Sequence, residues 1–248
     1  IGCQGVGMFN RFQWSPGSLR RNRMTAVYEP VQPFLFCAFL NYLKATTVFD
    51  VGANIGQYSI FSRQVPSVTK IHAFEAEQAA YSEMLLNIAL NGLEELINPQ
   101  FKAVSDVTGE VEFAVAKPMG GNNAIASTSI HSAKVYKEYR KVPSIALDDD
   151  HVMTGSSLGF KIDVEGHEAE VVEGAAKLLR NNRCILQIEM YGDVRHAADR
   201  LENLGFRRIF AAGVDVYFTN CETLLNPSQV ITVAEEALAA MIHHSLKG

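Results

Sequence analysis

The sequence predicts an α/β fold in which helices cover both faces of a mostly parallel β-sheet. The first observation is an apolar run, 47–51, that enters a glycine-rich loop, continues as a helix and is followed by a second apolar run, 70–75. The second is that the same alternation resumes after residue 158. The third is composition, since 248 residues with 48% hydrophobic and 20% charged side chains are ordinary for one globular domain. Strands and helices that alternate in this way form parallel sheets.

Each element of the first half follows from the spacing of its apolar residues. Helical spacing alternates with short apolar runs that end at polar or glycine residues. The pair Asn91-Gly92 is a typical signal for the end of a helix. The expected helices are 33–44, 55–64 and 78–90, and the expected strands are 47–51, 70–75 and 98–104.

The pattern changes between residues 107 and 150. Residues 109–116 alternate polar and apolar side chains with the period of two that is typical of a half-buried strand. A Gly/Asn loop at 120–123 and the hydroxyl-rich Ser127-Thr128-Ser129 follow, and a second extended run, 141–147, ends in three aspartates. We interpret 107–150 as a β-rich insertion over the carboxyl ends of the main strands, where loops usually carry specificity.

The second half restores the doubly wound pattern. The expected strands are 158–163, 184–190, 208–211 and 214–219, and the expected helices are 171–179, 193–204 and 230–242. Together these elements predict a Rossmann-like, doubly wound, mostly parallel sheet of seven strands whose final strand is antiparallel. The predicted organisation is an N-terminal extension and helix (1–46), an α/β domain with the insertion (47–225) and a C-terminal helix (226–248).

Both ends of the chain lie outside this pattern. Residues 1–30 mix arginines with aromatic side chains, and we expect them to pack on the domain through the aromatics. A lid, or an arm that touches an anionic substrate, is the alternative. The C-terminal helix carries an apolar stripe from Val230 to Ile242. The stripe should pack on the domain, and a homodimer interface is the less favoured use.

The stretch from Asp50 to Glu75 carries the clearest functional signal. Gly52 and Gly56 bracket a tight loop at a helix N-terminus, where a ligand can lie against bare backbone. Glu75 follows about 20 residues later, where a carboxylate reaches the hydroxyls of a ribose. A dinucleotide loop normally has three glycines, and Asp50 would repel a pyrophosphate but suit an ammonium or sulfonium group. These features favour S-adenosylmethionine (SAM), which carries both cations and a ribose without a phosphate.

A second group of ionisable residues follows the predicted strand 158–163. Asp163, Glu165, His167 and Glu168 lie within six residues, at the sheet edge that also holds the glycine loop. We expect one of the first three to act as general base, and His167 has the most suitable unperturbed pKa. A solvated turn is the alternative for the whole group, and a water-exposed helix start is the alternative for His167.

Composition restricts the partners and the location. A net charge of −5 gives no support to a nucleic-acid partner. No run approaches the ~18 uncharged apolar residues of a membrane span. The four cysteines lack the spacing of metal ligands and are typical of reduced thiols in a cytoplasmic protein. Mg²⁺ held by Asp163, Glu189 and one of the acids 148–150 is an option that we do not favour, so no metal site is predicted.

Two segments, 50–56 and 161–168, together resemble the FkbM-type methyltransferases, which have the class I methyltransferase fold. Ser127-Thr128-Ser129 and Leu147-Asp148-Asp149 are also similar to that family, and the resemblance covers about residues 45–220. It implies a SAM-dependent enzyme that methylates a hydroxyl group, with a small-molecule natural product or a glycan as acceptor.

The resemblance also implies roles for single residues. It places catalytic or substrate-binding duties on Asp163 and Glu165, whereas the His167 position accepts several residue types in the family. The cofactor should contact the loop residues and strand-end residues Asp50, Gly52, Ala53, Asn54, Gly56 and Glu75. Val104 and Ser105, at the end of the third strand, should lie beside the nucleoside base.

Two other functions stay open at this point. An NAD-dependent oxidoreductase on a Rossmann fold is the first, and the missing third glycine and the charge of Asp50 argue against it. The second is a non-catalytic nucleotide-binding module. The four acids at 50, 75, 163 and 165 argue against that function, because a binding module has no use for all of them.

Overall fold

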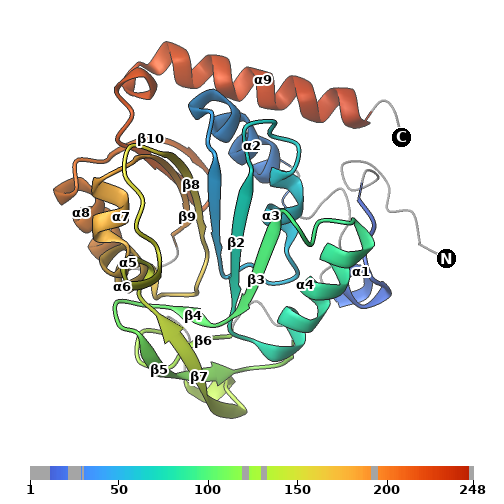
Figure 1. The fold of residues 1–248 in the computed structure, drawn as a ribbon. Helices are drawn as coiled ribbons and strands as arrows, with labels where there is room; N and C mark the ends of the chain where they lie inside the picture. Colours follow the sequence, from blue (N-terminus) through green and yellow to red (C-terminus); the bar gives the residue numbers. More distant parts are fainter. Residues whose placement is uncertain are drawn as a thin grey trace.

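A seven-stranded sheet forms the centre of the computed structural model, which describes residues 12–21, 29, 31–118, 123–129, 133–190 and 195–245 (Figure 1). Its strands are β1 (Thr47–Val51), β2 (Lys70–Glu75), β3 (Ile97–Phe101), β8 (Ser157–Ile162), β9 (Arg183–Glu189), β10 (Arg207–Ala212) and β11 (Asp215–Thr219). Their order across the sheet is β10-β11-β9-β8-β1-β2-β3. Only β11 runs against its neighbours, because it pairs antiparallel with both β9 and β10 while the other pairs are parallel. The predicted Rossmann-like sheet with an antiparallel final strand is therefore confirmed.

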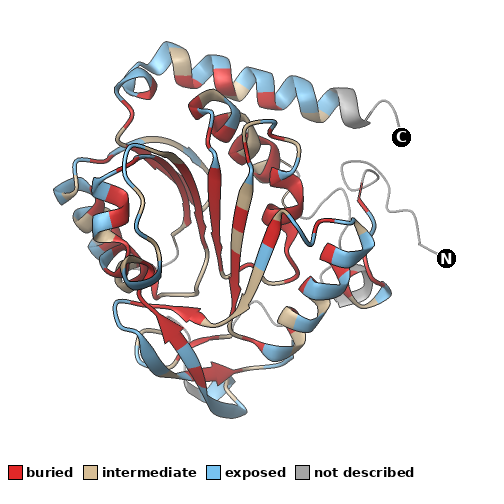
Figure 2. Cartoon of the chain, viewed as in Figure 1, coloured by how far each residue is buried: buried red, intermediate tan, exposed pale blue. Residues whose placement is uncertain are grey.

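Helices cover both faces of this sheet. They are α1 (Pro16–Arg21), α2 (Gln32–Leu43), α3 (Gln57–Ser62), α4 (Gln78–Leu90), α5 (Leu147–Asp150), α6 (Glu168–Gly174), α7 (Ala176–Arg180), α8 (Arg195–Asn203) and α9 (Pro227–Ser245), with short 3-10 turns at Ala133–Val135 and Glu222–Leu225. Successive residues of a strand point to opposite faces. Val48 belongs to the apolar cluster that includes residues of α2, α3, α4 and α9, and Phe49 belongs to the cluster that includes residues of α6 to α8. Figure 2 shows the central strands of the large sheet buried and the outer sides of the helices exposed.

A second, four-stranded sheet lies at the carboxyl ends of the large one, at the bottom of Figure 1. It contains β4 (Ala103–Val104), β5 (Gly109–Val115), β6 (Ala124–Ile125) and β7 (Glu138–Ile145), in the order β4-β7-β5-β6. Phe113, Ile125 and Val142 form its own small apolar cluster. Because β4 follows β3 directly, the small sheet is held against the edge where the main strands end.

Some element boundaries differ from the sequence prediction. The expected strand 98–104 is interrupted at Lys102, so its end becomes β4 of the small sheet. The expected helix 55–64 is shorter, and the expected helix 171–179 is broken at Ala175, whose φ is −113°. Next to that break, Gly174 packs so closely on the Ser105 backbone that a Cβ would overlap the Ser105 carbonyl oxygen.

The two ends of the chain pack on the domain where they are described. Phe12 and Trp14 are buried in the main apolar cluster, as expected for an aromatic extension, whereas Arg11 and Arg23 lie outside the described residues. Val233 and Ala237 of α9 join the same cluster. The homodimer stays a prediction. Within the described ranges, no helix combines the length and apolar character that a membrane crossing requires.

Candidate functional site

A cavity of about 440 Å³ lies at the carboxyl ends of β1, β2 and β8. The chain leaves β1 toward β2 and β3 on one side and returns to β8 on the other, so the strand order reverses between β1 and β8. Ligands of open α/β sheets bind at such a reversal. The cavity is lined by the acids Glu29, Glu75, Glu77, Asp163, Glu165, Glu189 and Asp215. Its other lining residues are Gln32, Val51, Gly52, Asn54, Phe74, Ala76, Ala80, Lys102, Ala103, Val104, Phe113, Asn123, Ile125, Val164 and Val214.

The glycine loop forms the floor of this cavity. Gly52 and Ala53 donate their N–H groups to the Phe74 carbonyl oxygen at 3.0 and 2.9 Å, which fixes the loop on β2. Gly52 has a φ of +78°, and a Cβ there would overlap the Asp163 carbonyl oxygen. Position 52 therefore requires glycine for two reasons, a left-handed backbone and a close approach between the loop and the end of β8.

Glu75, the last residue of β2, joins the loop to the cavity. Its Oε2 accepts a hydrogen bond from the Asn54 N–H at 2.7 Å, and its Oε1 accepts one from the Glu77 N–H at 2.7 Å. Burial raises the pKa of Glu75 to about 7, although both hydrogen bonds oppose the shift. Each carboxylate oxygen has a further lone pair, so Glu75 can still accept from hydroxyl groups of a ligand.

Asp50 does not have the position that the sequence predicted. Ser59 donates both its N–H (2.9 Å) and its Oγ–H (2.6 Å) to Asp50 Oδ2, so the carboxylate caps the start of α3 beneath the glycine loop. The residue is 1% exposed and lies outside the set of described residues that line the cavity. Burial raises its pKa to about 6. The structure places the Asp50 carboxylate under the loop and not at the cavity wall, and its contact with a cationic ligand stays a prediction.

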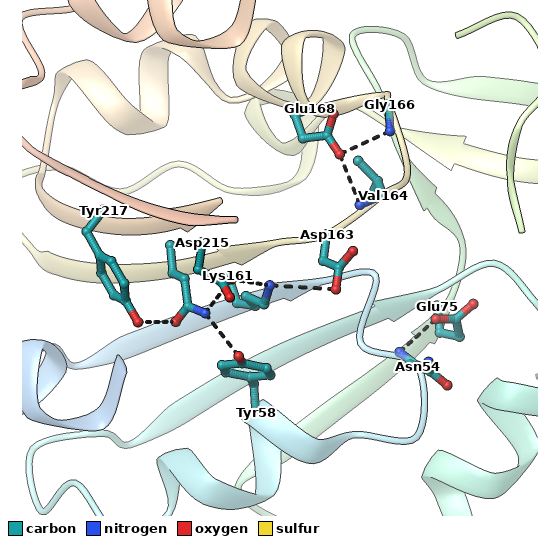
Figure 3. A network of polar contacts seen from close by, with 11 residues as sticks. Asn54, Tyr58, Glu75, Lys161, Asp163, Val164, Gly166, Glu168, Asp215 and Tyr217 are labelled. Carbon is teal, nitrogen blue, oxygen red and sulfur yellow. Dashed lines mark hydrogen bonds and ion pairs between the residues drawn. The ribbon is translucent and has the colours of Figure 1, made fainter. Parts of the chain in front are cut away.

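Asp163, which follows β8, faces the cavity and is backed by a buried lysine (Figure 3). Lys161 Nζ lies 3.6 Å from Asp163 Oδ2 and 3.2 Å from Asp215 Oδ1. Burial acts to lower the pKa of Lys161, but Asp163 and Asp215 outweigh it and hold the pKa above its usual value. The lysine is therefore a permanent cation directly behind the cavity.

The loop after Asp163 presents a second acid to the cavity. Glu165 has a φ of +56°, an unusual backbone conformation for a residue other than glycine. Glu168 supports this conformation, because its Oε1 accepts hydrogen bonds from the N–H groups of Gly166 (3.1 Å) and Val164 (3.4 Å). Strained backbone of this kind is concentrated at binding sites, where the surrounding structure holds it in place.

Glu189, at the end of β9, completes the acidic side of the cavity. Carboxylate oxygens of Asp163, Glu165 and Glu189 lie within 4.8 Å of one another. Burial raises the pKa of Glu189 to about 10, and the hydrogen bond and the charge of Asp163 act in the same direction. The three carboxylates could accept a divalent cation. The acids 148–150 do not contribute to this group: Asp148 accepts from the N–H of Lys177 and Leu178 at the start of α7, and Asp149 accepts from Thr108.

His167 is buried rather than exposed, and it connects two parts of the fold. Its Nε2 lies 2.9 Å from Ser105 Oγ, and its Nδ1 lies 2.7 Å from Thr128 Oγ1. Burial lowers its pKa below the ordinary value, although Glu170 and Asp106 oppose the shift. Neither His167 nor Ser105 is among the described residues that line the cavity. His167 therefore anchors the small-sheet region to the start of α6, and the contact of His167 or Ser105 with a ligand stays a prediction.

The structure brings together about half of the residues that the sequence singled out. The predicted residues that line the cavity are Gly52, Asn54, Glu75, Val104, Asp163 and Glu165. Ala53 and Gly56 shape the loop from outside it. Glu29, Lys161 and Asp215 were missed. A lysine inside the apolar run 158–162 was an available signal, since a buried lysine requires a carboxylate partner.

The residues of the cavity fit a nucleoside that carries a cationic side chain. Glu75 stands where ribose hydroxyls can donate to it, and the loop from Gly52 to Asn54 offers backbone without large side chains. Phe74, Ala76 and Val104 add apolar surface suitable for a base. The excess of acids would oppose a phosphate and favour a sulfonium and an ammonium group. This is the donor set expected for SAM.

Comparison with known proteins agrees with this description. Residues 50–208 match the family model described as Methyltransferase FkbM domain. A structure described as methyltransferase FkbM from Methylobacillus flagellatus KT is 14% identical with a TM-score of 0.45, over 71% of this chain and 43% of that one. A protein of the NADB-Rossmann superfamily from Streptococcus agalactiae is 14% identical with a TM-score of 0.42, over 76% of this chain and 66% of that one.

Another similar structure has a length close to that of this chain. The precorrin-6y C5,15-methyltransferase of Geobacter metallireducens GS-15 is 13% identical with a TM-score of 0.46, over 86% of this chain and 95% of that one. By contrast, the chain spans less than two thirds of the length of the Methylobacillus and Streptococcus proteins. The search among curated proteins found no match.

Proposed function

Because the chain belongs to the FkbM methyltransferase family, we propose that it is a SAM-dependent O-methyltransferase whose acceptor is a hydroxyl group of a saccharide or another natural product. One observation carries the proposal: Glu75 and Asp163, at the ends of two strands that flank β1, line the same cavity across the glycine loop. In this proposal Glu75 holds the ribose of the cofactor. Asp163 is the acid that acts on the acceptor hydroxyl.

The cofactor half of the site consists of β2, its following residues and the loop. Glu75 would accept hydrogen bonds from the ribose hydroxyls, while the Asn54 N–H already holds one of its oxygens. Hydrogen bonds to the Phe74 carbonyl oxygen and the Glu75 carboxylate hold the loop in this shape. A site that is ordered in advance loses less conformational entropy on binding.

The transfer half consists of Asp163 and Glu165. Bound SAM supplies an electrophilic methyl group, and the acceptor hydroxyl must be held in line with it. We assign proton acceptance from that hydroxyl to the Asp163 carboxylate, with Glu165 positioned to orient the acceptor. General-base assistance of this kind is typically worth ~10²- to 10⁴-fold in rate. His167 has no direct part, since it contacts Ser105 and Thr128.

The charge of the cavity argues against two other ligand classes, NAD and RNA. Seven acids line the cavity, and Lys102 is the only basic residue among the described residues that line it. A pyrophosphate of NAD, or a phosphodiester of RNA, would enter a field of the same sign. A neutral polyhydroxyl acceptor meets no such cost and finds several carboxylates as hydrogen-bond acceptors.

Calorimetry and an acceptor screen test the proposal. The protein should bind SAM and S-adenosylhomocysteine, and it should show no measurable heat with NAD. Radiolabelled methyl transfer from SAM to a panel of methyl glycosides and hydroxylated natural products should yield an alkali-stable ether product. Asp163→Asn should lower the rate of transfer ~10²- to 10⁴-fold while SAM binding survives. Tight NAD binding without SAM binding would overturn the proposal.

A further inference from the structure

We propose that Lys161 is a positioning residue of the methyl-transfer site, and that its buried ammonium group holds the Asp163 carboxylate in the orientation that accepts the acceptor proton. This inference rests on the proposed function, because it assigns Lys161 a role in the same reaction. The first observation is burial: Lys161 is 2% exposed and so cannot reach the acceptor itself. An amine at this depth acts through the groups that it touches.

The network around Lys161 is asymmetric. Asp215 is 3% exposed in its side chain, whereas Asp163 is 28% exposed. Both partners line the cavity, but Asp215 is almost fully enclosed by protein whereas Asp163 is the more open of the two (Figure 3). It also lies 5.0 Å from the centre of the Tyr58 ring, which adds a cation–π contact.

Asp215, the more enclosed partner of Lys161, is held by further hydrogen bonds. Gln187 Nε2 donates to Asp215 Oδ1 at 2.7 Å and to Tyr58 Oη at 3.0 Å. Tyr217 Oη donates to Gln187 Oε1 at 2.8 Å, so the amide cannot rotate without loss of a hydrogen bond. These contacts come from β9, β11 and α3. Lys161 is thus held in place by a hydrogen-bonded network, and its ammonium group in turn orients the Asp163 carboxylate.

The cavity wall explains why such a residue is needed. Carboxylate oxygens of Asp163, Glu165 and Glu189 lie within 4.8 Å of one another. Burial and Asp163 raise the pKa of Glu189 to about 10, so its carboxyl group keeps its proton and donates it to Asp163. Without a cation, Asp163 would be oriented by these two neighbours alone. Lys161 Nζ, 3.6 Å from Asp163 Oδ2, adds a charge attraction that holds the carboxylate in place.

The test is a double-mutant cycle on full-length protein. Lys161→Met, Asp163→Asn and the double variant are compared with wild type for kcat, for KM and for SAM affinity by calorimetry. The methyl acceptor is the one that gives the highest rate in the glycoside and natural-product panel. Lys177→Met, which removes an exposed lysine side chain, is the matched control.

We expect Lys161→Met to lower kcat by about 10²-fold, near the lower end of general-base effects, with SAM affinity within about threefold of wild type. In the Asp163→Asn background the same change should alter kcat by less than about twofold, because the residue through which Lys161 acts is already disabled. Equal losses in both backgrounds, or an unchanged kcat, would overturn the inference.

Two further outcomes need their own criteria: a Lys161→Met variant that does not fold, and a wild-type protein that does not bind SAM. If Lys161→Met does not fold, Asp215→Asn removes the inner anchor and should show the same loss of kcat with the same dependence on Asp163. An unchanged kcat in that variant overturns the inference. If wild-type protein binds no SAM at all, the proposed function fails, and this inference fails with it. If the wild type is active and Lys161→Met has the same kcat, the inference about Lys161 fails while the proposed function stands.

Discussion

Ser59 donates both its backbone N–H and its hydroxyl group to one oxygen of Asp50, Oδ2. The pair joins the end of β1 to the first turn of α3, and the glycine loop spans the gap between them. Asp50 therefore fixes the distance between the two ends of the glycine loop through its hydrogen bonds to Ser59. We therefore expect Asp50 to support ligand binding by keeping the loop in place.

Asp50→Asn and Asp50→Ala separate this role from a direct contact with the ligand. Because both hydrogen bonds end on one oxygen, asparagine can keep them, and we expect SAM affinity within about threefold of wild type. Alanine loses both bonds, and we expect a loss of about 1–3 kcal/mol in the free energy of unfolding. Thermal unfolding and calorimetry check both variants. A large loss of SAM affinity in a stable Asp50→Asn protein would instead support a direct electrostatic role.

Gly52→Ala should damage the site more than a left-handed backbone alone can explain. The new Cβ would overlap the Asp163 carbonyl oxygen, so the loop and the end of β8 must separate. Gly92→Ala is the matched control, because Gly92 also has a positive φ of +61° but nothing within 4 Å of the added carbon. The control should lose about 1–2 kcal/mol of stability with SAM binding intact. Gly52→Ala should lose more stability and measurable SAM binding as well.

SAM affinity should rise with pH through the titration of Glu75. Burial raises the pKa of Glu75 to about 7, and a ribose that donates hydrogen bonds to this carboxylate favours its ionised form. Binding therefore releases a proton, and affinity should increase about tenfold for each unit by which binding lowers the pKa. Calorimetry between pH ~6 and ~8 in buffers of different ionisation enthalpy measures both effects.

A second acid makes the assignment to Glu75 testable. Burial also raises the pKa of Glu29 to about 7, although Lys161 opposes the shift, and Glu29 lines the same cavity. Glu75→Gln should weaken SAM binding and flatten its pH dependence, whereas Glu29→Gln should leave the dependence in place. The reverse result would assign the titration to Glu29.

His167 should make the protein less stable in mild acid. Burial holds its folded-state pKa below the unfolded value of about 6.5, so the unfolded chain binds more protons as pH falls below that value. The stability that neutral His167 contributes is therefore complete above pH ~6.5 and decreases below it. The fall in Tm between pH ~7.5 and ~5.5 should be larger for wild type than for His167→Gln.

Activity provides the other half of this test. Loss of one of the two hydrogen bonds in His167→Gln should cost about 0.5–1.5 kcal/mol, or about 1–6 °C in Tm. Since His167 contacts Ser105 and Thr128 rather than the cavity, kcat should fall far less than in Asp163→Asn. A kcat as low as that of Asp163→Asn in a folded His167→Gln protein would restore the histidine as a catalytic residue.

The parallel sheet and the two strand-end acids were predictable because local pattern determines them. Glu75 and Asp163 each follow a short apolar run, and parallel strands place such ends at one edge. The direction of the Asp50 side chain was not predictable, because Ser59 comes close to Asp50 only when the loop between β1 and α3 has folded. The division of the third strand at Lys102 gave no turn signal, since the residues on both sides favour extended structure.

The missed residues share a different cause. Asp215 lies far from Lys161 in the sequence, and only the antiparallel pairing of β11 with β9 brings the two together. The unperturbed pKa of histidine suits a general base, which made His167 one of the candidates before its two hydroxyl partners were known. Contacts between distant segments decide both cases, and one sequence does not contain them in any local pattern.

The four strands of the small sheet lie in the sequence between β3 and β8, and none of them joins the large sheet. Two of its residues, Phe113 and Ile125, line the cavity. Its attachment includes the contact of Thr128 with His167. A module joined in this way could be exchanged between relatives while the cofactor machinery stays intact. Chimeras that swap this segment would then inherit the acceptor preference of the donor enzyme.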